Sequence, residues 1–402
     1  MTTRRHFLQT MGAATAASLT PRSWTHSGDA RAAERPKRPV AAVVTIYRQG
    51  SHSDVILGKI LRGWKYDGGP GPDLQLAALY VDQYGPGDMA RDFSREYGFP
   101  LVDRIEDALT LGTDRIAVDG VISIGEHGEY PWNEKEQHLY PRKRFFREIA
   151  DTMERRGRVV PVFNDKHLGP EWADAIWMYR RAQELKIPFM AGSSLAVGAR
   201  EPQTTFPRGE RVAACLGIGY SGLDIYGFHT LEFLQVMLER RAGGETGVAA
   251  VQSLSGEAIP DMIANGTLDG ELLDAGLAAS QTTREQLLAS KLNDAVVFLI
   301  EYRDGLKAPV LMLPSVAAAI SASWRVAGQP PVAVRAMEHR EPHYPHFAEL
   351  LRGIEAMVHA GRPTYPVERT LLTTGLLDSL LTSRQQSGKR LPTPHLAIQY
   401  AS

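Results

Sequence analysis

Short apolar runs alternate with amphipathic segments through the first half of the chain. The runs are almost continuous, as in strands buried on both faces of a parallel sheet, and lie at 41–47, 74–81, 118–125, 159–163 and 187–192. Between them, apolar residues recur at helical spacing over 54–64, 89–97, 105–109 and 170–185. This alternation of strands and helices predicts an α/β domain with a parallel sheet.

The pattern changes near residue 200, where strands and helices no longer alternate. We expect helices at 225–239, 348–360 and 367–383, and strands at 248–254, 295–302 and 310–313. The sequence therefore predicts a nucleotide-binding-type domain at 40–195, followed by an α+β domain at 196–402. The closing helices within 348–383 are expected to pack back on the first domain.

Composition and charge narrow the classes of partner. The 402 residues are 43% hydrophobic and 23% charged, enough to bury one large core or two medium cores. Forty-five basic and 46 acidic side chains leave a formal charge of -1, so the chain lacks the electrostatic signature of a protein that binds nucleic acid or anionic membranes. The single cysteine, Cys215, excludes an intrachain disulfide and lies in an apolar stretch, where we expect a small buried core residue.

The N-terminus has the features of an export signal in the correct order. Segment 3–9 contains Arg4-Arg5 and matches the twin-arginine pattern, the apolar stretch 11–19 is too short to span a bilayer, and Ala30-Arg31-Ala32 suits cleavage. We expect a signal peptide at 1–33, a linker at 34–39, export by the twin-arginine machinery, and a mature periplasmic or extracellular chain without a membrane span. The alternative is a chance pair of arginines.

Ionisable side chains gather where predicted strands end. Asp165-Lys166-His167 follows the fourth strand, and Glu126 and His127 follow the third. Open α/β sheets bind ligands at the carboxyl ends of their strands, so we expect these side chains in one crevice. Asp82, at the end of the second strand, occupies the place from which an acid binds a ribose hydroxyl.

Motifs in both halves of the chain follow one order. The strand 118–124 precedes Val162-Phe163-Asn164-Asp165-Lys166-His167-Leu168, a helix and strand at 173–192, Gly227-Phe228-His229-Thr230-Leu231-Glu232, and closing helices over 354–391. This order covers most of the mature chain and resembles the Gfo/Idh/MocA family of sugar and polyol dehydrogenases, also called the glucose-fructose oxidoreductase family. Residues 162–168 are similar to the family's Glu-Lys-Pro segment, and 227–232 to its Gly-x-His-x-x-Asp motif.

The resemblance implies a fold and an activity. The fold is an N-terminal Rossmann-like domain followed by an α+β domain with a large, open, mostly antiparallel sheet, which the family commonly uses for oligomerisation. The implied activity is oxidation or reduction at a hydroxyl of a sugar, glycoside or polyol. NAD or NADP is expected to be tightly bound, because free nicotinamide is scarce outside the cytoplasm, and the protein is expected to be a homo-oligomer.

The resemblance also implies roles for individual residues. Lys166, Asp165 and His229 are expected to be catalytic, and burial in a cleft can bring a lysine or histidine pKa into the useful range. The residues expected to bind substrate are Glu126, His127, His167, Asp224 and Glu232. Those expected to bind the cofactor are Tyr47, Gly50, Ser51, Asp82 and Gly125. Asp82 favours NAD over NADP, because a carboxylate repels a 2′-phosphate.

Two departures from the family pattern keep other functions open. Tyr47-Arg48-Gln49-Gly50-Ser51-His52-Ser53-Asp54 replaces the Gly-x-Gly-x-x-Gly turn, and His167 replaces the motif proline. One alternative is a cofactor-independent sugar lyase or hydrolase that uses a divalent metal, with ligands from Glu126, His127, Asp165, His167 and His229. A third hypothesis is a non-catalytic carbohydrate-binding protein.

Three other features have simpler interpretations. A long insertion at 130–147 is expected to form an active-site lid or an oligomer contact. Arg240-Arg241 is expected at a solvated helix end, and His346 in a surface loop.

Overall fold

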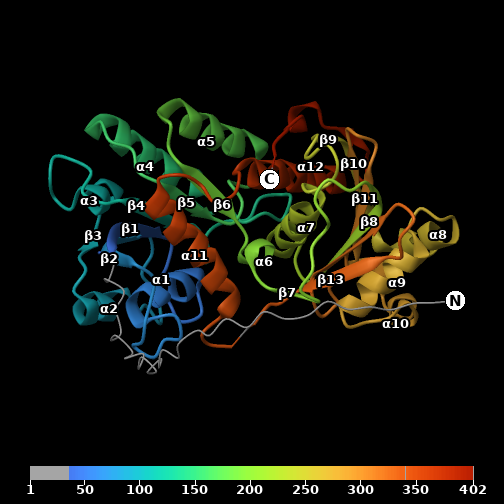
Figure 1. Cartoon of the computed structure of the whole chain (residues 1–402), viewed down its shortest axis with the longest axis horizontal. Coiled ribbons are helices and arrows are strands. Elements are labelled where there is room, and N and C mark those ends of the chain that lie inside the picture. The colour runs from blue at the N-terminus through green and yellow to red at the C-terminus, as the bar shows by residue number, and fades with distance from the viewer. Residues whose placement is uncertain (1–35, 340, 402) are drawn as a thin grey trace, which may run out of the picture. The chain divides into compact units, whose positions relative to one another are not determined.

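The computed structural model describes residues 36–339 and 341–401, which Figure 1 shows as a labelled ribbon. The predicted twin-arginine signal peptide at 1–33 and the start of the linker 34–39 lie outside the described residues. Within the part of the chain that is described, no helix combines the length and the apolar character needed to cross a bilayer.

The first sheet has six parallel strands in the order β3-β2-β1-β4-β5-β6. They are β1 (Arg38–Val44), β2 (Leu74–Val81), β3 (Leu101–Val102), β4 (Gly120–Ile124), β5 (Val162–Asp165) and β6 (Phe189–Gly192). This doubly wound order confirms the predicted Rossmann-like sheet, and it reverses between β1 and β4, where such folds bind ligands at the carboxyl ends of the strands.

Helices cover both faces of the first sheet (Figure 1). One face packs against α1 (His52–Arg62), α2 (Ala90–Tyr97) and α11 (Pro345–Ala360). The other packs against α3 (Ile105–Thr110), α4 (Arg142–Arg156) and α5 (Trp172–Leu185). Successive residues of β1 belong to opposite cores, as the two-residue period of a strand requires: Val40 and Ala42 to the first, Ala41 and Val43 to the second.

The second sheet has eight strands in the order β14-β9-β10-β11-β8-β12-β13-β7. They are β7 (Arg200–Glu201), β8 (Val212–Gly219), β9 (Val248–Ser255), β10 (Val296–Tyr302), β11 (Lys307–Met312), β12 (Ser321–Val326), β13 (Val332–Ala336) and β14 (Leu391–Pro392). Every neighbouring pair is antiparallel except β11 with β8. The expected large, mostly antiparallel sheet is therefore confirmed.

The second sheet also lies between two groups of helices. A Cβ on Gly217 of β8 would touch Leu234 of α7 (Ile225–Leu238), whereas Leu216 and Ile218 lie beside Gly276 of α9 (Gly270–Ala279). The group with α7 includes α12 (Glu368–Gln385), and the group with α9 includes α8 (Ile259–Ala264) and α10 (Arg284–Ala289). A short helix, α6 (Ser194–Val197), follows β6. Cys215, also in β8, is buried, as predicted.

Three local expectations are corrected. The segment 130–147 is not one insertion, because α4 begins at Arg142. Arg241 is not solvated: it is buried and pairs with Glu245 and Asp304. His346 is buried as well, in the first turn of α11, rather than on a surface loop.

Buried polar contacts join the end of β6 to α7 and α12. Glu232 of α7 accepts hydrogen bonds from the Ser193 amide and the Thr370 hydroxyl, each at 2.5 Å. These oxygens lie over Gly192, where an added Cβ would be 2.8 Å from Glu232 Oε1. With φ at +135°, Gly192 is also in a conformation that side-chain-bearing residues rarely adopt. The last residue of β6 is therefore fixed against both helices.

A buried ion pair joins the C-terminal end of α7 to the start of α12. Arg369 donates two hydrogen bonds to Glu239, from Nε at 2.8 Å and from Nη2 at 2.5 Å, and both side chains are buried. Removing one partner leaves the other charge without compensation in the interior.

Arg369→Ala should lower the free energy of unfolding by about 3 to 5 kcal/mol, because the Glu239 carboxylate would remain buried without its cation. Denaturant unfolding followed by circular dichroism measures this loss. Arg390→Ala is the matched control, since Arg390 also donates two hydrogen bonds to one glutamate, Glu301, but the two side chains are 54% and 39% exposed. Equal and small effects of the two substitutions would contradict this account.

Glu232 should make the protein less stable as the pH rises. Burial raises the pKa of Glu232 from its usual value near 4.5 to about 7, so the folded state binds the proton more tightly than the unfolded state. This contribution to stability is complete below the unfolded pKa and is lost as the pH rises through 7.

Glu232→Gln cannot ionise and keeps an acceptor for the Ser193 amide. Relative to this variant, the wild type should lose about 2 kcal/mol of unfolding free energy between about pH 5 and pH 8. Denaturant titrations of both proteins across this range measure the difference. A difference that does not change with pH would show that Glu232 does not titrate there.

Candidate active site

Lys166 follows the last residue of β5 and turns the chain out of the sheet. Its φ is 63°, and its amide donates to the Gly192 carbonyl at 3.1 Å. Asn164 Nδ2 holds the corner by donating to the His167 carbonyl at 3.1 Å. A positive φ is uncommon for lysine and costs about 1 kcal/mol, and such strain concentrates at functional sites. The corner places the Lys166 side chain in the interior, where it is 3% exposed.

Glu126, just after β4, lies between two buried cations. Its Oε1 accepts from Lys166 Nζ at 2.9 Å, and its Oε2 accepts from Arg142 Nη2 at 2.6 Å. Burial opposes the charge of Glu126, but the Lys166 ammonium and the Arg142 guanidinium outweigh it, so its pKa lies well below the usual range. A Cβ on Gly125 would be 2.7 Å from Arg142 Cγ, so any larger residue at this position would clash with the Arg142 side chain.

Arg142 also fixes the tautomer of His167. Arg142 Nη1 donates to His167 Nε2 at 2.9 Å, and His167 Nδ1 donates to the Gly169 carbonyl at 2.8 Å. A guanidinium cannot accept a hydrogen bond, so the proton of the neutral imidazole is on Nδ1. Burial and then Arg142 hold the pKa of His167 well below its usual range. Asp224 Oδ1 lies 3.8 Å from His167 Nε2.

His229 reaches the same region from α7. Its Nδ1 lies 2.6 Å from Ser193 Oγ, which also accepts the Leu195 amide at 3.1 Å. The Ser193 hydroxyl can donate its proton to Nδ1, and in that arrangement the proton of the neutral imidazole lies on Nε2. Burial and then the charge of Lys166 hold the pKa of His229 well below its usual range. The imidazole is therefore a neutral donor close enough to Lys166 to be affected by its charge.

His52, the first residue of α1, reaches Asp165 at the end of β5. Its Nδ1 lies 2.6 Å from Asp165 Oδ2. The His52 ring packs edge-on against His127, with centroids 5.3 Å apart, and against Phe347, with centroids 4.9 Å apart. Burial and then the neighbouring His52 lower the pKa of His127 to about 4.

These residues form one group, here named the strand-end cluster: His52, Glu126, His127, Arg142, Asp165, Lys166, His167, Asp224 and His229. Four of its buried polar atoms have no hydrogen-bond partner among the described residues: Asp165 Oδ1, Asp224 Oδ1, His127 Nε2 and Arg142 Nε. Such atoms are normally satisfied by ordered water or by a bound molecule, and this set includes both donors and acceptors. Hydroxyl groups, which donate and accept, are chemically suited to it.

The cluster contains most of the residues expected at the site, and two that were not expected. All the predicted catalytic and substrate-binding residues belong to it except Glu232, whose two oxygens bind Ser193 and Thr370. Arg142 and His52 are the additions. The helical spacing of Phe145, Phe146 and Ile149 is a signal that would have placed Arg142 at a helix start beside the strand end.

The segment expected to bind a pyrophosphate uses its polar groups internally. The Gly50 amide donates to Asp54 Oδ2 at 3.0 Å, and Ser51 Oγ donates to the Arg48 carbonyl at 2.6 Å. Asp54 also forms an ion pair with Arg62. A carboxylate therefore stands at the start of α1, where a phosphate would otherwise bind. These residues do not fit a pyrophosphate, and NAD or NADP stays a prediction.

Asp82 is similarly occupied, whereas Tyr47 lies at a cavity. Asp82 accepts from the hydroxyls of Tyr80 and Tyr130, each at 2.7 Å, and pairs with Arg144. Tyr47 lines a cavity of about 520 Å³ at the carboxyl ends of the first sheet. Segments that follow β1, β2 and β4 complete the lining, including Arg48, Gln83, Tyr84 and Glu129. The volume lies in the range of small-molecule sites.

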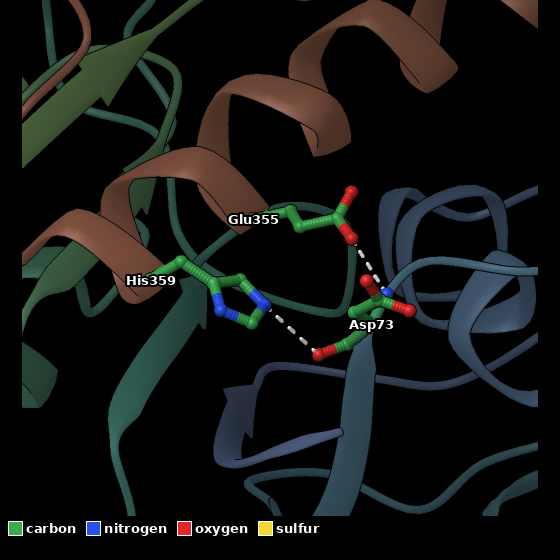
Figure 2. Close-up of side chains that lie close together, drawn as sticks. All are labelled: Asp73, Glu355 and His359. Atoms are coloured by element: carbon green, nitrogen blue, oxygen red, sulfur yellow. Dashed lines mark hydrogen bonds between the residues drawn. The ribbon is translucent and has the colours of Figure 1, made fainter. Parts of the chain in front are cut away.

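The predicted metal ligands do not converge as a metal site would require. Among the described residues, only Asp73, Glu355 and His359 bring three such donor atoms within 4.8 Å of one another. Figure 2 shows Glu355 and His359, from α11, turned toward Asp73, which precedes β2. Glu355 accepts the Asp73 amide at 2.6 Å, and His359 Nε2 lies 3.2 Å from the Asp73 carbonyl. These contacts tether α11 at the amino ends of the parallel strands, whereas the strand-end cluster lies at their carboxyl ends.

No family model and no curated protein matches the chain by sequence. Comparison of structures gives matches over nearly the full length. The NAD complex of GenD2 from gentamicin A biosynthesis has a TM-score of 0.55 at 13% identity, and the alignment covers 93% of this chain and 99% of that chain.

Two further matches are solved structures of oxidoreductases with similarly low sequence identity. Scyllo-inositol dehydrogenase from Lactobacillus casei, with bound NAD(H) and scyllo-inositol, has a TM-score of 0.54 at 10% identity, over 89% of this chain and 99% of that chain. Aldose-aldose oxidoreductase from Caulobacter crescentus, complexed with glycerol, has a TM-score of 0.50 at 13% identity over the same shares. At these identities the likeness establishes the fold, and this chain has the two-sheet fold of inositol and sugar oxidoreductases.

Proposed function

We propose that the protein is an oxidoreductase that acts on a hydroxyl of a sugar, glycoside or polyol at the strand-end cluster. The observation that carries the proposal is that Lys166 and His229 are both buried beside the carboxyl ends of the first sheet: Lys166 follows β5, and His229, from α7, contacts Ser193 directly after β6 at 2.6 Å. The structural neighbours include an NAD complex, an inositol dehydrogenase and an aldose oxidoreductase, which supports the substrate class.

The two residues are suited to binding the oxygen that reacts. Oxidation of a hydroxyl removes a proton from oxygen and a hydride from carbon, so negative charge develops on the oxygen. The Lys166 ammonium, held by Glu126, would stabilise that charge, and the Nε2 proton of His229 would donate to the same atom. The unpartnered oxygens of Asp165 and Asp224 would accept hydrogen bonds from neighbouring hydroxyls.

Oxidation of a hydroxyl requires a hydride acceptor. Tightly bound NAD or NADP is expected from the resemblance, and the cavity beside Tyr47 offers room for a small molecule. The Asp54 carboxylate at the start of α1 disfavours a pyrophosphate at that turn.

A second candidate function is favoured by the contact between His52 and Asp165. This contact places an imidazole and a carboxylate in the crevice, and an enzyme that works by proton transfer requires such an acid-base pair. A sugar lyase or hydrolase that works by proton transfer alone is therefore the alternative, without the metal that the donor spacing fails to support.

Location and assembly belong to the proposal as well. Export by the twin-arginine pathway to the periplasm or exterior is supported by the order of features in residues 3–32. A homo-oligomer is supported by the resemblance. Fractionation of cells that produce the full chain, and light scattering of the purified protein, test the two statements.

The mass of the product should identify the reaction. The natively purified protein is incubated with a set of sugars, glycosides and polyols, with and without NAD and NADP, and products are read by mass spectrometry. We expect a product lighter by two hydrogen atoms. Nicotinamide dinucleotide released on denaturation, or a product formed only with added NAD or NADP, would identify the hydride acceptor. A product lighter by water would establish the lyase, one heavier by water the hydrolase, and binding without any product would contradict both enzymes.

Lys166→Met and His229→Asn should each lower kcat by about 100-fold or more, because each removes a donor to the charged oxygen. The asparagine introduced by His229→Asn would keep an acceptor at the position of Nδ1 for the Ser193 hydroxyl, so the local structure is preserved. Lys143→Met is the matched control: Lys143 also pairs with a carboxylate, that of Asp174, but both side chains are more than 20% exposed. Steady-state kinetics and circular dichroism provide the measurements, and unchanged kcat in both folded variants would refute the site.

A further inference from the structure

His52 occupies a position that the fold normally reserves for a phosphate-binding turn. It is the first residue of α1, directly after the turn at Gly50 and Ser51, and β1 precedes that turn. Its imidazole reaches from there to β5, on the far side of β4. The His52 side chain therefore lies at the carboxyl ends of the strands, where doubly wound sheets bind ligands.

The contact with Asp165 orients the imidazole. Nδ1 and Asp165 Oδ2 are 2.6 Å apart, so the carboxylate accepts the Nδ1 proton and the lone pair of the neutral ring is on Nε2. Among the residues that the structure describes, His52 Nε2 has no hydrogen-bond partner. The Asp165 side chain is 1% exposed and that of His52 is 14% exposed. The imidazole is therefore fixed by a buried carboxylate and is itself partly accessible to solvent.

The groups around His52 come from three elements. His127 follows β4, Asp165 ends β5, and His346 and Phe347 belong to α11. His127 and Asp165 each carry a buried atom without a partner among the described residues, Nε2 and Oδ1. Ordered water or a ligand with hydroxyl groups would satisfy both atoms, so they support a polar binding site beside His52.

We propose that His52, oriented by Asp165, is a catalytic base of this site for a polyhydroxylated substrate. In the step, a substrate O–H proton passes to His52 Nε2, the electron pair of that bond stays on the oxygen, and the resulting imidazolium is stabilised by Asp165. The inference rests on the proposed function for its substrate class. It assigns proton removal to His52, while Lys166 and His229 bind the oxygen.

The alternative is that His52 only tethers α1 to β5. His52→Asn separates the two roles, because the asparagine amide lies where Nδ1 was and can still donate to Asp165, but no base remains. A catalytic base predicts a loss of kcat of about 100-fold or more with the fold retained, whereas a tether predicts little change. Asp165→Asn should give a similar loss, because an amide donates to Nδ1 and moves the ring proton to Nε2.

A chemical readout tests the pair without turnover. Diethyl pyrocarbonate acylates imidazole nitrogens that carry a lone pair, and peptide mapping by mass spectrometry gives the rate at His52. We expect rapid labelling in the wild type, slower labelling in Asp165→Asn, and protection of the wild type by a bound polyol such as myo-inositol. His359→Asn, at the tether of α11, is the control and should change neither labelling nor turnover.

The outcomes separate this inference from the proposed function. Turnover of another kind in the wild type, such as loss or addition of water, with a loss of kcat of about 100-fold in His52→Asn, would overturn the proposed oxidoreductase and support the base. Full kcat in His52→Asn, or a labelling rate at His52 that does not change in Asp165→Asn, would overturn the inference.

Discussion

Two cations, Lys166 and Arg142, share the carboxylate of Glu126 inside the protein, and the rest of the site depends on that neutralisation. Burying one of these charges alone would cost several kcal/mol, and burying both cations together would add their repulsion. With Glu126 between them, Lys166 can stay in the interior. Arg142 is fixed in turn and sets the tautomer of His167, and Gly125 is required because Arg142 fills the space beside it.

The fold places this cluster at the reversal point of the first sheet, and α7 adds His229 from the second part of the chain. α7 is fixed there by the buried hydrogen bonds of Glu232 with Ser193 and Thr370, beside Gly192. The position of His229 therefore depends on a buried junction rather than on a loop. The first turn of α1 differs from a phosphate-binding turn in its chemistry. The Gly50 amide before it donates to the Asp54 carboxylate, and His52, its first residue, contacts Asp165. A shared fold therefore does not by itself decide the reaction here.

The parts of the fold that could be predicted are those whose burial leaves a periodic pattern. β2 and α7 follow from continuous apolar runs and helical spacing, and their observed bounds agree closely with the expected ones. β12 could not be found in this way, because Ser321 and Ser323 are buried on its inner face. Each hydroxyl donates to a carbonyl of α9 at 2.9 Å, so polar residues stand where the pattern requires apolar ones.

The sequence alone located Glu126, Asp165, Lys166 and His167, because each follows a buried strand and the carboxyl ends of parallel strands must share one edge. It did not determine what these residues bind. The contact between His52 and Asp165 spans 113 positions, and the contacts of Glu126 depend on where α4 begins as it returns over the sheet. Local periodicity records which face of an element is buried, whereas the partners of a buried charge are decided by the packing of distant segments, which only the tertiary structure specifies.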